Sequence, residues 1–287
     1  MLDEYSPLRR VGLRHPRDMF RDQDYVRRNW RAHDFEREPD MARTVREYET
    51  FLEALLETGA EPVWFDADAR FAMASIYARD SCVRVPDGIV PARMGFPYRA
   101  EEPGIDAERY GALGYRVHPG IAPAGTLEGG DMVWFHEHLC AVGEGYRTNA
   151  EGIRQLRARL PEGVHLEVMH TPHFRGPDFC LHLMSLLSPV DSDLAVVYSP
   201  YMSVRFRRWL QEHLGMTFVE VPDAEFDQQG ANVLALAPRK VMLAEGCPIT
   251  HRRLEAAGCD VLTFPADDLC VAGVGGPTCL TRPLARG

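Results

Sequence analysis

The feature that most constrains the fold of this 287-residue chain is a recurring order of elements: strand, turn, strand, helix, strand. One instance begins with the strand-like runs 130–135 and 138–143, continues with a helical pattern after Asn149, and ends with the apolar run 164–169. The order returns at intervals of roughly 50 to 60 residues. A doubly wound sheet would alternate single strands with helices, so the pattern predicts an α/β array of repeated units arranged around an axis.

The same pattern fills most of the chain. Pro86, Asp87 and Gly88 supply the turn between predicted strands at 81–85 and 89–94. The other predicted elements are helices over 41–58, 204–214 and 249–257, strands over 62–65, 217–221 and 260–264, a hairpin over 232–244, and two β-rich runs within 180–198. No Ser/Gly-rich or Pro-rich linker separates them, so we expect a single domain over 1–287.

Composition excludes several classes of protein. The chain has 42 acidic and 32 basic residues, which argues against a nucleic-acid partner because phosphate backbones are bound by clustered Lys and Arg. No run of about 18 apolar residues occurs, so neither a membrane span nor a membrane partner is expected. The N-terminus is charged from Asp3 onward and lacks the apolar stretch of a signal peptide, so we expect a cytoplasmic protein.

One of the cysteines stands apart from the others. The seven cysteines are odd in number and never form a CxxC pair, which is typical of buried thiols in a reducing compartment. Cys279, however, follows the loop 273–277, which contains three glycines and a proline. Such loops often present reactive side chains, so Cys279 is the leading candidate for a nucleophile. The alternative is a buried thiol that happens to follow a glycine-rich turn.

A cysteine nucleophile needs a neighbouring base or positive charge, because its unperturbed pKa of about 8.5 leaves it mostly protonated at neutral pH. His182 is the candidate, since it stands inside an apolar, strand-like run where an imidazole has few partners. The alternative is a core histidine bonded to a backbone carbonyl. His136, His138, His170 and His173 are interpreted as members of polar loops, and no familiar metal or phosphate motif occurs, so no metal or other cofactor is expected.

Two short motifs carry carboxylates beside predicted strands. Glu128 and Asp131 flank a diglycine, where they could bind a cation or manage a proton, although Glu-Gly-Gly-Asp is also an ordinary turn. Asp80 follows Arg79 ahead of another strand, and the alternative for these two residues is a surface ion pair. Arg147 precedes a predicted helix, where its guanidinium is free to bind an anion.

Taken in order, five motifs resemble the signature blocks of the guanidino-group-modifying, or pentein, superfamily, which contains arginine deiminases, amidinotransferases and dimethylarginine dimethylaminohydrolases. The motifs are Arg79-Asp80, Leu127-Glu128-Gly129-Gly130-Asp131, Tyr146-Arg147-Thr148-Asn149, Leu181-His182-Leu183 and Gly275-Gly276-Pro277-Thr278-Cys279. The fold that this resemblance implies is a five-bladed α/β propeller of ββαβ modules with pseudo-fivefold symmetry and the site in its central channel. That expectation agrees with the repeated unit.

The resemblance also implies a role for each motif residue. Cys279 matches the nucleophile of the superfamily, and His182 matches its general acid and base. Glu128 matches the carboxylate that holds and polarises the guanidinium, and Asp80 matches the acid that grips its nitrogens. Arg147 matches the arginine that receives the α-carboxylate of an amino-acid substrate.

Three further positions complete the expected substrate site. Asp131 matches the second acid of the diglycine motif and is expected to be structural. Met184 stands two positions after the motif histidine, where deiminases and amidinotransferases have an aspartate. An apolar thioether there would tolerate an N-alkylated guanidinium better than an unsubstituted one. Arg93 opens the loop 93–103, which together with 170–177 is expected to select the substrate.

The favoured interpretation is therefore a hydrolase that converts a methylated arginine to citrulline and an alkylamine through a covalent thiouronium intermediate. An amidinotransferase, an arginine deiminase and a dihydrolase are alternatives within the superfamily. A non-enzymatic pentein binding protein is an alternative from another class, and the coexistence of Cys279, His182 and Glu128 argues against it. The expected partner is a small guanidino substrate, and a homodimer is left open.

Overall fold

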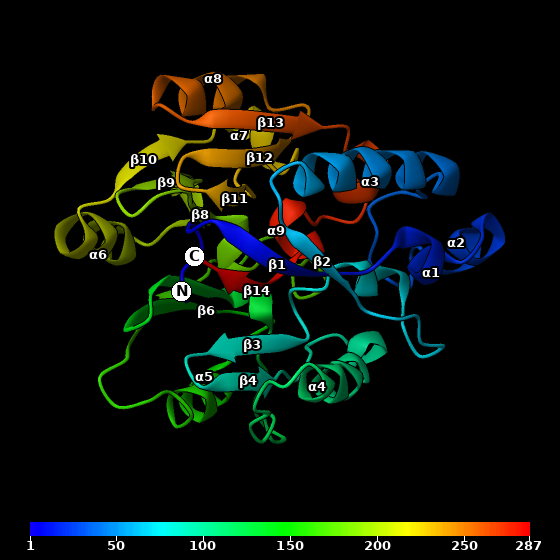
Figure 1. Cartoon of the computed structure of the whole chain (residues 1–287), viewed down its shortest axis with the longest axis horizontal. Coiled ribbons are helices and arrows are strands. Elements are labelled where there is room, and N and C mark those ends of the chain that lie inside the picture. Colours follow the sequence, from blue (N-terminus) through cyan, green and yellow to red (C-terminus); the bar gives the residue numbers. More distant parts are fainter.

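The computed structural model describes residues 1–287 and contains five small β-sheets (Figure 1). In three of them an antiparallel hairpin is extended by a third strand, which is parallel to the second hairpin strand and is reached through a helix. The elements are β5 (Met132–His136), β6 (Leu139–Glu144), α5 (Ala150–Arg157) and β7 (His165–His170); β8 (Leu187–Pro189), β9 (Leu194–Val197), α6 (Val204–Leu214) and β10 (Thr217–Glu220); and β11 (Leu234–Ala237), β12 (Lys240–Ala244), α8 (Pro248–Ala256) and β13 (Asp260–Phe264). The repeated unit predicted from the sequence is confirmed.

The other two sheets are variants of the same unit. Their elements are β3 (Cys82–Val85), β4 (Gly88–Pro91) and α4 (Glu102–Ala112) in one, and β14 (Arg282–Arg286), β1 (Leu8–Leu13), α3 (Met41–Leu56) and β2 (Glu61–Trp64) in the other. A parallel bridge between Ile89 and Val117 stands where a third strand would follow α4. β1 pairs antiparallel with β14 and parallel with β2. The first and last strands therefore share one sheet, and Figure 1 shows the two termini side by side.

Local sequence explains where the helices begin and end. The carboxylate of Asp40 caps α3 by accepting from the Arg43 N–H at 2.7 Å, and α6 ends at Gly215, whose φ of +62° suits glycine. The remaining helices are short: α1 (Pro16–Phe20), α2 (Gln23–Asn29), α7 (Asp223–Phe226) and α9 (Pro277–Leu280). No helix has both the length and the apolar character that crossing a membrane requires.

The buried apolar side chains form four clusters rather than one continuous core. Leu127, Leu183 and Leu280 belong to three different clusters, and each adjoins in sequence a polar residue of the site described below. Burial of each leucine stabilises the fold by about 1.5–3 kcal/mol and also fixes the direction of its polar neighbour. The separate apolar clusters thus anchor the parts of one polar site.

Most predicted strands and helices are confirmed to within a few residues, and the helix over 204–214 is confirmed at both ends. The predicted β-rich run from residue 180 is wrong, because the backbone forms a 3₁₀ turn over Leu183–Ser185 and becomes a strand only at Leu187. The prediction of 93–103 as loop missed the start of α4. No local sequence pattern predicted β1 and β14, since these strands pair with each other from opposite ends of the chain.

Candidate functional site

One cavity collects chemically active side chains from segments that lie outside the strands. Its lining residues are His33, Asp34, Glu36, Ala74, Tyr77, Asp80, Phe96, Tyr98, Arg99, Asp178, Phe179, Cys180, His182, Ser185, Gly273, Val274, Gly275 and Cys279. A second cavity, with a volume of about 260 Å³, shares five lining residues with it: Glu36, Phe179, Cys180, Ser185 and Val274. Asp80, His182 and Cys279, which were selected from separate sequence motifs, therefore face one space.

The polar residues at and around this cavity occupy equivalent positions in the five modules. Each stands two to five residues before the first strand of its sheet: Asp80 before β3, Glu128 before β5, His182 before β8, Asn232 before β11, and Cys279 before β14. Each module therefore supplies one polar residue from the same place in its topology.

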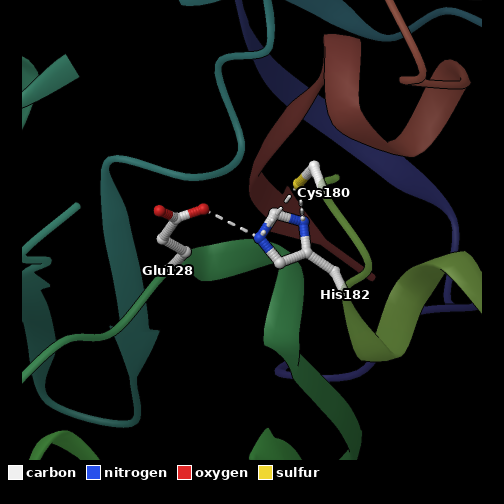
Figure 2. A group of neighbouring side chains, drawn as sticks. All are labelled: Glu128, Cys180 and His182. Carbon is white, nitrogen blue, oxygen red and sulfur yellow. Dashed lines mark hydrogen bonds and ion pairs between the residues drawn. The ribbon is translucent and has the colours of Figure 1, made fainter. Parts of the chain in front are cut away.

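His182 and Glu128 form a buried pair (Figure 2). The distance from Nε2 of His182 to Oε2 of Glu128 is 2.8 Å. The other carboxylate oxygen of Glu128 accepts from the Gly95 N–H at 2.7 Å, so both oxygens have partners. The carboxylate is thereby fixed in orientation and in turn fixes the imidazole ring.

The diglycine motif allows this close packing. A Cβ added at Gly130 would collide with the His182 ring and would lie 2.9 Å from Oδ1 of Asp80, so no larger residue fits. Asp131, next in sequence, accepts at Oδ1 from the Leu183 N–H at 2.9 Å. Burial raises the pKa of Asp131 to about 6. Asp131 thus holds the turn that carries His182 and does not line the cavity.

Asp80 presents one unused acceptor to the site. Its Oδ2 accepts from Nη1 of Arg99 at 2.7 Å, and Arg99 is held in turn by Glu102 at 2.7 Å. The other oxygen, Oδ1, is buried without a hydrogen-bond partner and lies 3.9 Å from Nδ1 of His182. Burial alone would raise the pKa of Asp80, but Arg99 and His182 outweigh it and hold that pKa below its usual value. The residue is therefore an anion with a free acceptor.

Arg79, the partner of Asp80 in the sequence motif, has a different function in the fold. It is buried, forms an ion pair with Glu4 at 3.1 Å, and donates from Nε to the Thr278 carbonyl at 2.9 Å. The alternative of a surface ion pair between Arg79 and Asp80 is therefore wrong. Arg79 instead ties the segment before β3 to the helix that carries Cys279.

Cys279 lies in the short helix α9 and is positioned by Asn232. The Asn232 Nδ2 group donates to Sγ of Cys279 at 3.2 Å, while its Oδ1 accepts from the N–H of Thr278 at 3.0 Å and from its hydroxyl at 2.7 Å. A Cβ on Gly276 would lie 2.6 Å from that Oδ1, which explains a glycine at this point of the loop. Burial and the charge of Asp80 raise the pKa of Cys279, and His182 and Asn232 only partly oppose them.

In contrast to the neutral thiol of Cys279, the side chain of His182 is positively charged. Burial alone would lower its pKa, but the groups around it, including Cys180, Asp131 and Asp80, outweigh that effect and raise its pKa well above the usual value. The imidazole is therefore protonated at neutral pH and can donate a proton. The two catalytic candidates thus start as a neutral thiol and an imidazolium.

Arg147 is buried beside the cavity but does not line it. Its guanidinium lies 3.7 Å from the ring centroid of Phe96, which is a lining residue, and its Nη2 donates to the Pro177 carbonyl. Nε and Nη1 of Arg147 are buried without partners. Two unused cationic donors beside a cavity can receive an anionic group.

Two predicted substrate residues are placed elsewhere. Met184 is 2% exposed and belongs to an apolar cluster, because the 3₁₀ turn directs it into the core and leaves Ser185 on the cavity. The prediction that Met184 contacts the substrate therefore does not agree with its position outside the cavity lining. Arg93 is exposed and donates to the Gly125 carbonyl at 3.3 Å, outside the cavity lining. The loop that Arg93 opens does reach the cavity through Phe96 and Tyr98.

Sequence reasoning missed three residues of the site. Asn232 could have been found from the module repeat, because it holds the position before β11 that the other site residues hold before their strands. Arg99 lies in a segment predicted as loop, and nothing local marks its ion pair with Asp80. Cys180 was grouped with the buried thiols, but its Sγ lies 3.6 and 3.7 Å from the two ring nitrogens of His182. Together with Glu128, these two residues form a group of potential metal ligands.

Comparison with known proteins gives one family. The sequence matches the arginine deiminase family over residues 73–214 and 199–286. An uncharacterised protein of Aeropyrum pernix is 32% identical over 196 residues, which cover 68% of this chain and 66% of that protein. An arginine deiminase of Rhodococcus erythropolis is 27% identical over 248 residues, which cover 74% of this chain and 60% of the relative. The chain thus spans between three fifths and two thirds of these relatives.

Solved structures share the fold over nearly the full chain. Dimethylarginine dimethylaminohydrolase of Pseudomonas aeruginosa, solved with citrulline, is 21% identical, with a TM-score of 0.76 and coverage of 96% of this chain and 98% of that one. The N-terminal domain of ArgZ, a cyanobacterial arginine dihydrolase solved with its product, is 16% identical, with a TM-score of 0.80 and coverage of 96% and 97%. At these identities the likeness concerns the fold.

Proposed function

This chain belongs to the arginine deiminase family, within the pentein superfamily of guanidino-modifying enzymes, and from that premise we propose that it is a cysteine-dependent hydrolase of a guanidino C–N bond. We also propose that residues 1–287 form a single catalytic domain whose five modules close into a propeller. The shared sheet of β1 and β14 supports that closure, because it joins the first module to the last.

The observation that carries the proposal is the buried, unpartnered Oδ1 of Asp80 in a cavity that also contains the thiol of Cys279 and the imidazolium of His182. An unpaired carboxylate oxygen in such a site is costly unless a cationic donor fills it, and a guanidinium is a planar cation with N–H donors. The two free donors of Arg147 would receive the carboxylate of an amino-acid substrate.

In the first half-reaction the substrate would activate the thiol. A bound guanidinium neutralises Asp80, one of the charges that raise the pKa of Cys279, so the thiol loses its proton to solvent and the thiolate forms when substrate is present. The thiolate attacks the guanidinium carbon and forms a C–S bond as a C–N π bond opens. His182 then protonates the departing nitrogen, the C–N bond breaks, and an amine leaves a thiouronium on Cys279. The Asn232 amide holds the sulfur throughout.

In the second half-reaction water would release the product. The now neutral imidazole of His182 takes a proton from water, whose oxygen attacks the thiouronium carbon. The C–S bond then breaks and its electron pair returns to sulfur, the hydroxyl on carbon loses its proton to solvent as the C=O bond forms, and a ureido compound departs. Glu128, bonded to the ring at 2.8 Å, stabilises the imidazolium that forms. The sum of the two steps is one water consumed for one amine released.

The absence of an aspartate at position 184 affects which substrate the site prefers. Position 184 is a buried methionine, so no carboxylate reaches the substrate from that position. An unsubstituted guanidinium brings more N–H donors than the single free oxygen of Asp80 can accept, whereas an N-alkylated one brings fewer donors. We therefore propose a substituted arginine or related guanidino compound as the preferred substrate. Deimination of arginine is the second candidate, and the match to the arginine deiminase family favours it.

The test is a panel of arginine, N-methylated arginines, agmatine and smaller guanidines, assayed for ammonia, alkylamine and ureido product. The proposal predicts a ureido product in the absence of any acceptor amine, and Cys279→Ser is the control for contaminating activity. A transferase would instead need an acceptor amine and yield a new guanidino compound. A protein that binds guanidines without turnover would support the non-enzymatic alternative.

A further inference from the structure

A third cavity is lined by residues near the start of the chain and by parts of β3, β5 and β14. Its volume is about 20 Å³, and it shares no lining residue with the catalytic cavity. Its charged lining residues are Asp3, Glu4, Arg79, Arg84 and Arg282. From their arrangement we infer that Arg79 and Arg282 form a binding site for a monovalent anion of halide size, such as chloride.

The two arginines have hydrogen-bond donors without acceptors. Both are buried, with exposed fractions of 2% and 5%. Arg79 donates from Nη1 to Glu4 at 3.1 Å and from Nε to the Thr278 carbonyl at 2.9 Å, but its Nη2 has no partner. Arg282 donates from Nη2 to the carbonyls of Arg79 and Cys82, but its Nε has no partner. Unpaired cationic donors are costly to bury, so two of them at one cavity favour an anion.

Positive charge exceeds negative charge around this cavity. Arg286, also 5% exposed, adds a third buried guanidinium, which donates to backbone carbonyls only and leaves Nε and Nη2 without partners. The Asp3 carboxylate is engaged in its own turn, where it accepts from the N–H and the hydroxyl of Ser6 at 2.7 and 2.6 Å. Glu4 is therefore the one carboxylate that pairs with these three guanidinium groups, through Arg79.

The pKa values of the arginines agree with this excess of positive charge. Burial lowers the pKa of Arg282, and the neighbouring charge of Arg79 adds to the effect. Burial also lowers the pKa of Arg286 to about 10, with Glu4 opposing and Arg79 again adding to the effect. An anion among these groups would offset their mutual repulsion and stabilise their charged forms.

The size of the cavity selects the class of anion. A cavity of about 10–15 Å³ or more is needed to hold one water-sized group, so this one accepts a single small group. A halide is only slightly larger than a water molecule, whereas a phosphate or an organic carboxylate has several more atoms. A single negative charge also avoids strong repulsion from Glu4, which lines the same cavity.

Arg79 connects this cavity to the helix that carries Cys279. Besides the bond from its side chain to Thr278, its backbone N–H donates to the Cys279 carbonyl at 3.2 Å. An anion that holds the Arg79 guanidinium would therefore also stabilise the position of α9. Binding of the anion does not depend on the proposed function, because the site is separate from the catalytic cavity.

Bromide is a direct probe of the site, because it resembles chloride and its anomalous scattering identifies it in a crystal. Crystals of the full-length chain grown in bromide should show an anomalous peak in this cavity, within hydrogen-bond distance of Arg79 and Arg282. The absence of a peak there overturns the inference. Peaks confined to exposed arginines would mean an adventitious ion only, and would overturn it as well.

Thermal unfolding tests the same site in solution. At constant ionic strength, bromide replaces gluconate, which is too large for the cavity, and the Tm should rise and then saturate. Arg282→Gln should raise the half-saturating bromide concentration at least tenfold, because it removes a cationic donor. Glu4→Gln should lower that concentration several-fold, because it removes the competing carboxylate.

Arg205→Gln, which changes an exposed arginine, is the matched control and should leave the half-saturating concentration unchanged. An equal response to bromide in Arg282→Gln and the unaltered chain overturns the inference. If Arg282→Gln does not fold, Glu4→Gln decides, because a merely structural role of Glu4 would not make bromide bind more tightly. Since neither measurement uses turnover, failure of the proposed function would leave these outcomes unaffected.

Discussion

Two thiols face the same cavity, and their surroundings differ. Cys279 receives a hydrogen bond from the Asn232 amide and lies in a helix whose backbone is tied to that same side chain. Cys180 lies in coil, and its thiol has only the imidazole of His182 as a hydrogen-bond partner. Both are half-buried, so exposure does not distinguish them. The comparison indicates that a cysteine nucleophile is distinguished by the groups that position and stabilise its sulfur.

The largest expected effect separates the two thiols directly. Cys279→Ser should reduce turnover by at least about 10³-fold, because a serine hydroxyl is not ionised by these neighbours, while Cys180→Ser should retain activity within a few-fold. The measurement is kcat for each variant on the best substrate of the panel, with a thermal melt to verify folding. If Cys180→Ser were the inactive variant, the assignment of the two thiols would be reversed.

The next effect tests the acceptor opposite the nucleophile. Asp80→Asn keeps the shape of the side chain but removes the charge, and it should lower kcat/KM by about 10- to 100-fold because a charge-assisted hydrogen bond to the substrate is lost. Steady-state kinetics with the preferred substrate measure this loss. Asp193→Asn, which changes an exposed acid, is the matched control and should leave the kinetics unchanged. Equal kinetics in both variants would remove Asp80 from the substrate site.

A smaller effect examines what distinguishes Cys279 from Cys180. Asn232→Ala removes the donor that lowers the pKa of Cys279, so the pH profile for alkylation of that thiol by iodoacetamide should move to higher pH, by up to about one unit. Alkylation at Cys279 is followed by mass spectrometry of the peptides. Asn149→Ala, which removes a helix cap and costs about 1 kcal/mol of stability, should leave the profile in place. An identical shift in both variants would indicate general loosening instead.

The smallest effect concerns the pH dependence of activity, which is set by the titration of His182. Activity should fall as pH rises through the pKa of His182, because the imidazolium donates the proton. Asp131→Asn removes one of the charges that raise this pKa but keeps an oxygen for the Leu183 N–H, so the alkaline limb should move to lower pH by less than about one unit. The pH profile of kcat measures this shift. A limb that stays in place would mean that Asp131 does not act on His182.

The same substitution has a consequence for stability. The pKa of Asp131 is raised from its ordinary 3.8 to about 6 in the folded protein. The contribution of Asp131 to the stability of the fold is therefore fully present below pH 3.8 and is lost as pH rises through 6. Ionisation therefore costs at most about 3 kcal/mol at neutral pH. Asp131→Asn should raise the Tm more at pH 8 than at pH 5.

The sequence by itself determined the repeated unit and the chemistry-bearing motifs, because turns, helix caps and apolar periodicity are local. It predicted the hairpins and helices of three modules, and its motifs indicated Asp80, Glu128, His182 and Cys279 as site residues. Local signals failed where the contact is distant. β1 pairs with β14, and Arg99 forms an ion pair with Asp80. The amide of Asn232 donates a hydrogen bond to Cys279, which lies 47 positions further along the chain.

Only the tertiary structure decided which side chains share a space. Met184 and Ser185 are adjacent in sequence, yet one joins an apolar cluster and the other lines the cavity, because a 3₁₀ turn replaces the expected strand and changes the direction of each side chain. The protonation states follow from the same packing, since burial and neighbouring charges act through space. The residue types can therefore be taken from the sequence, but their directions, partners and charges depend on how the five modules pack.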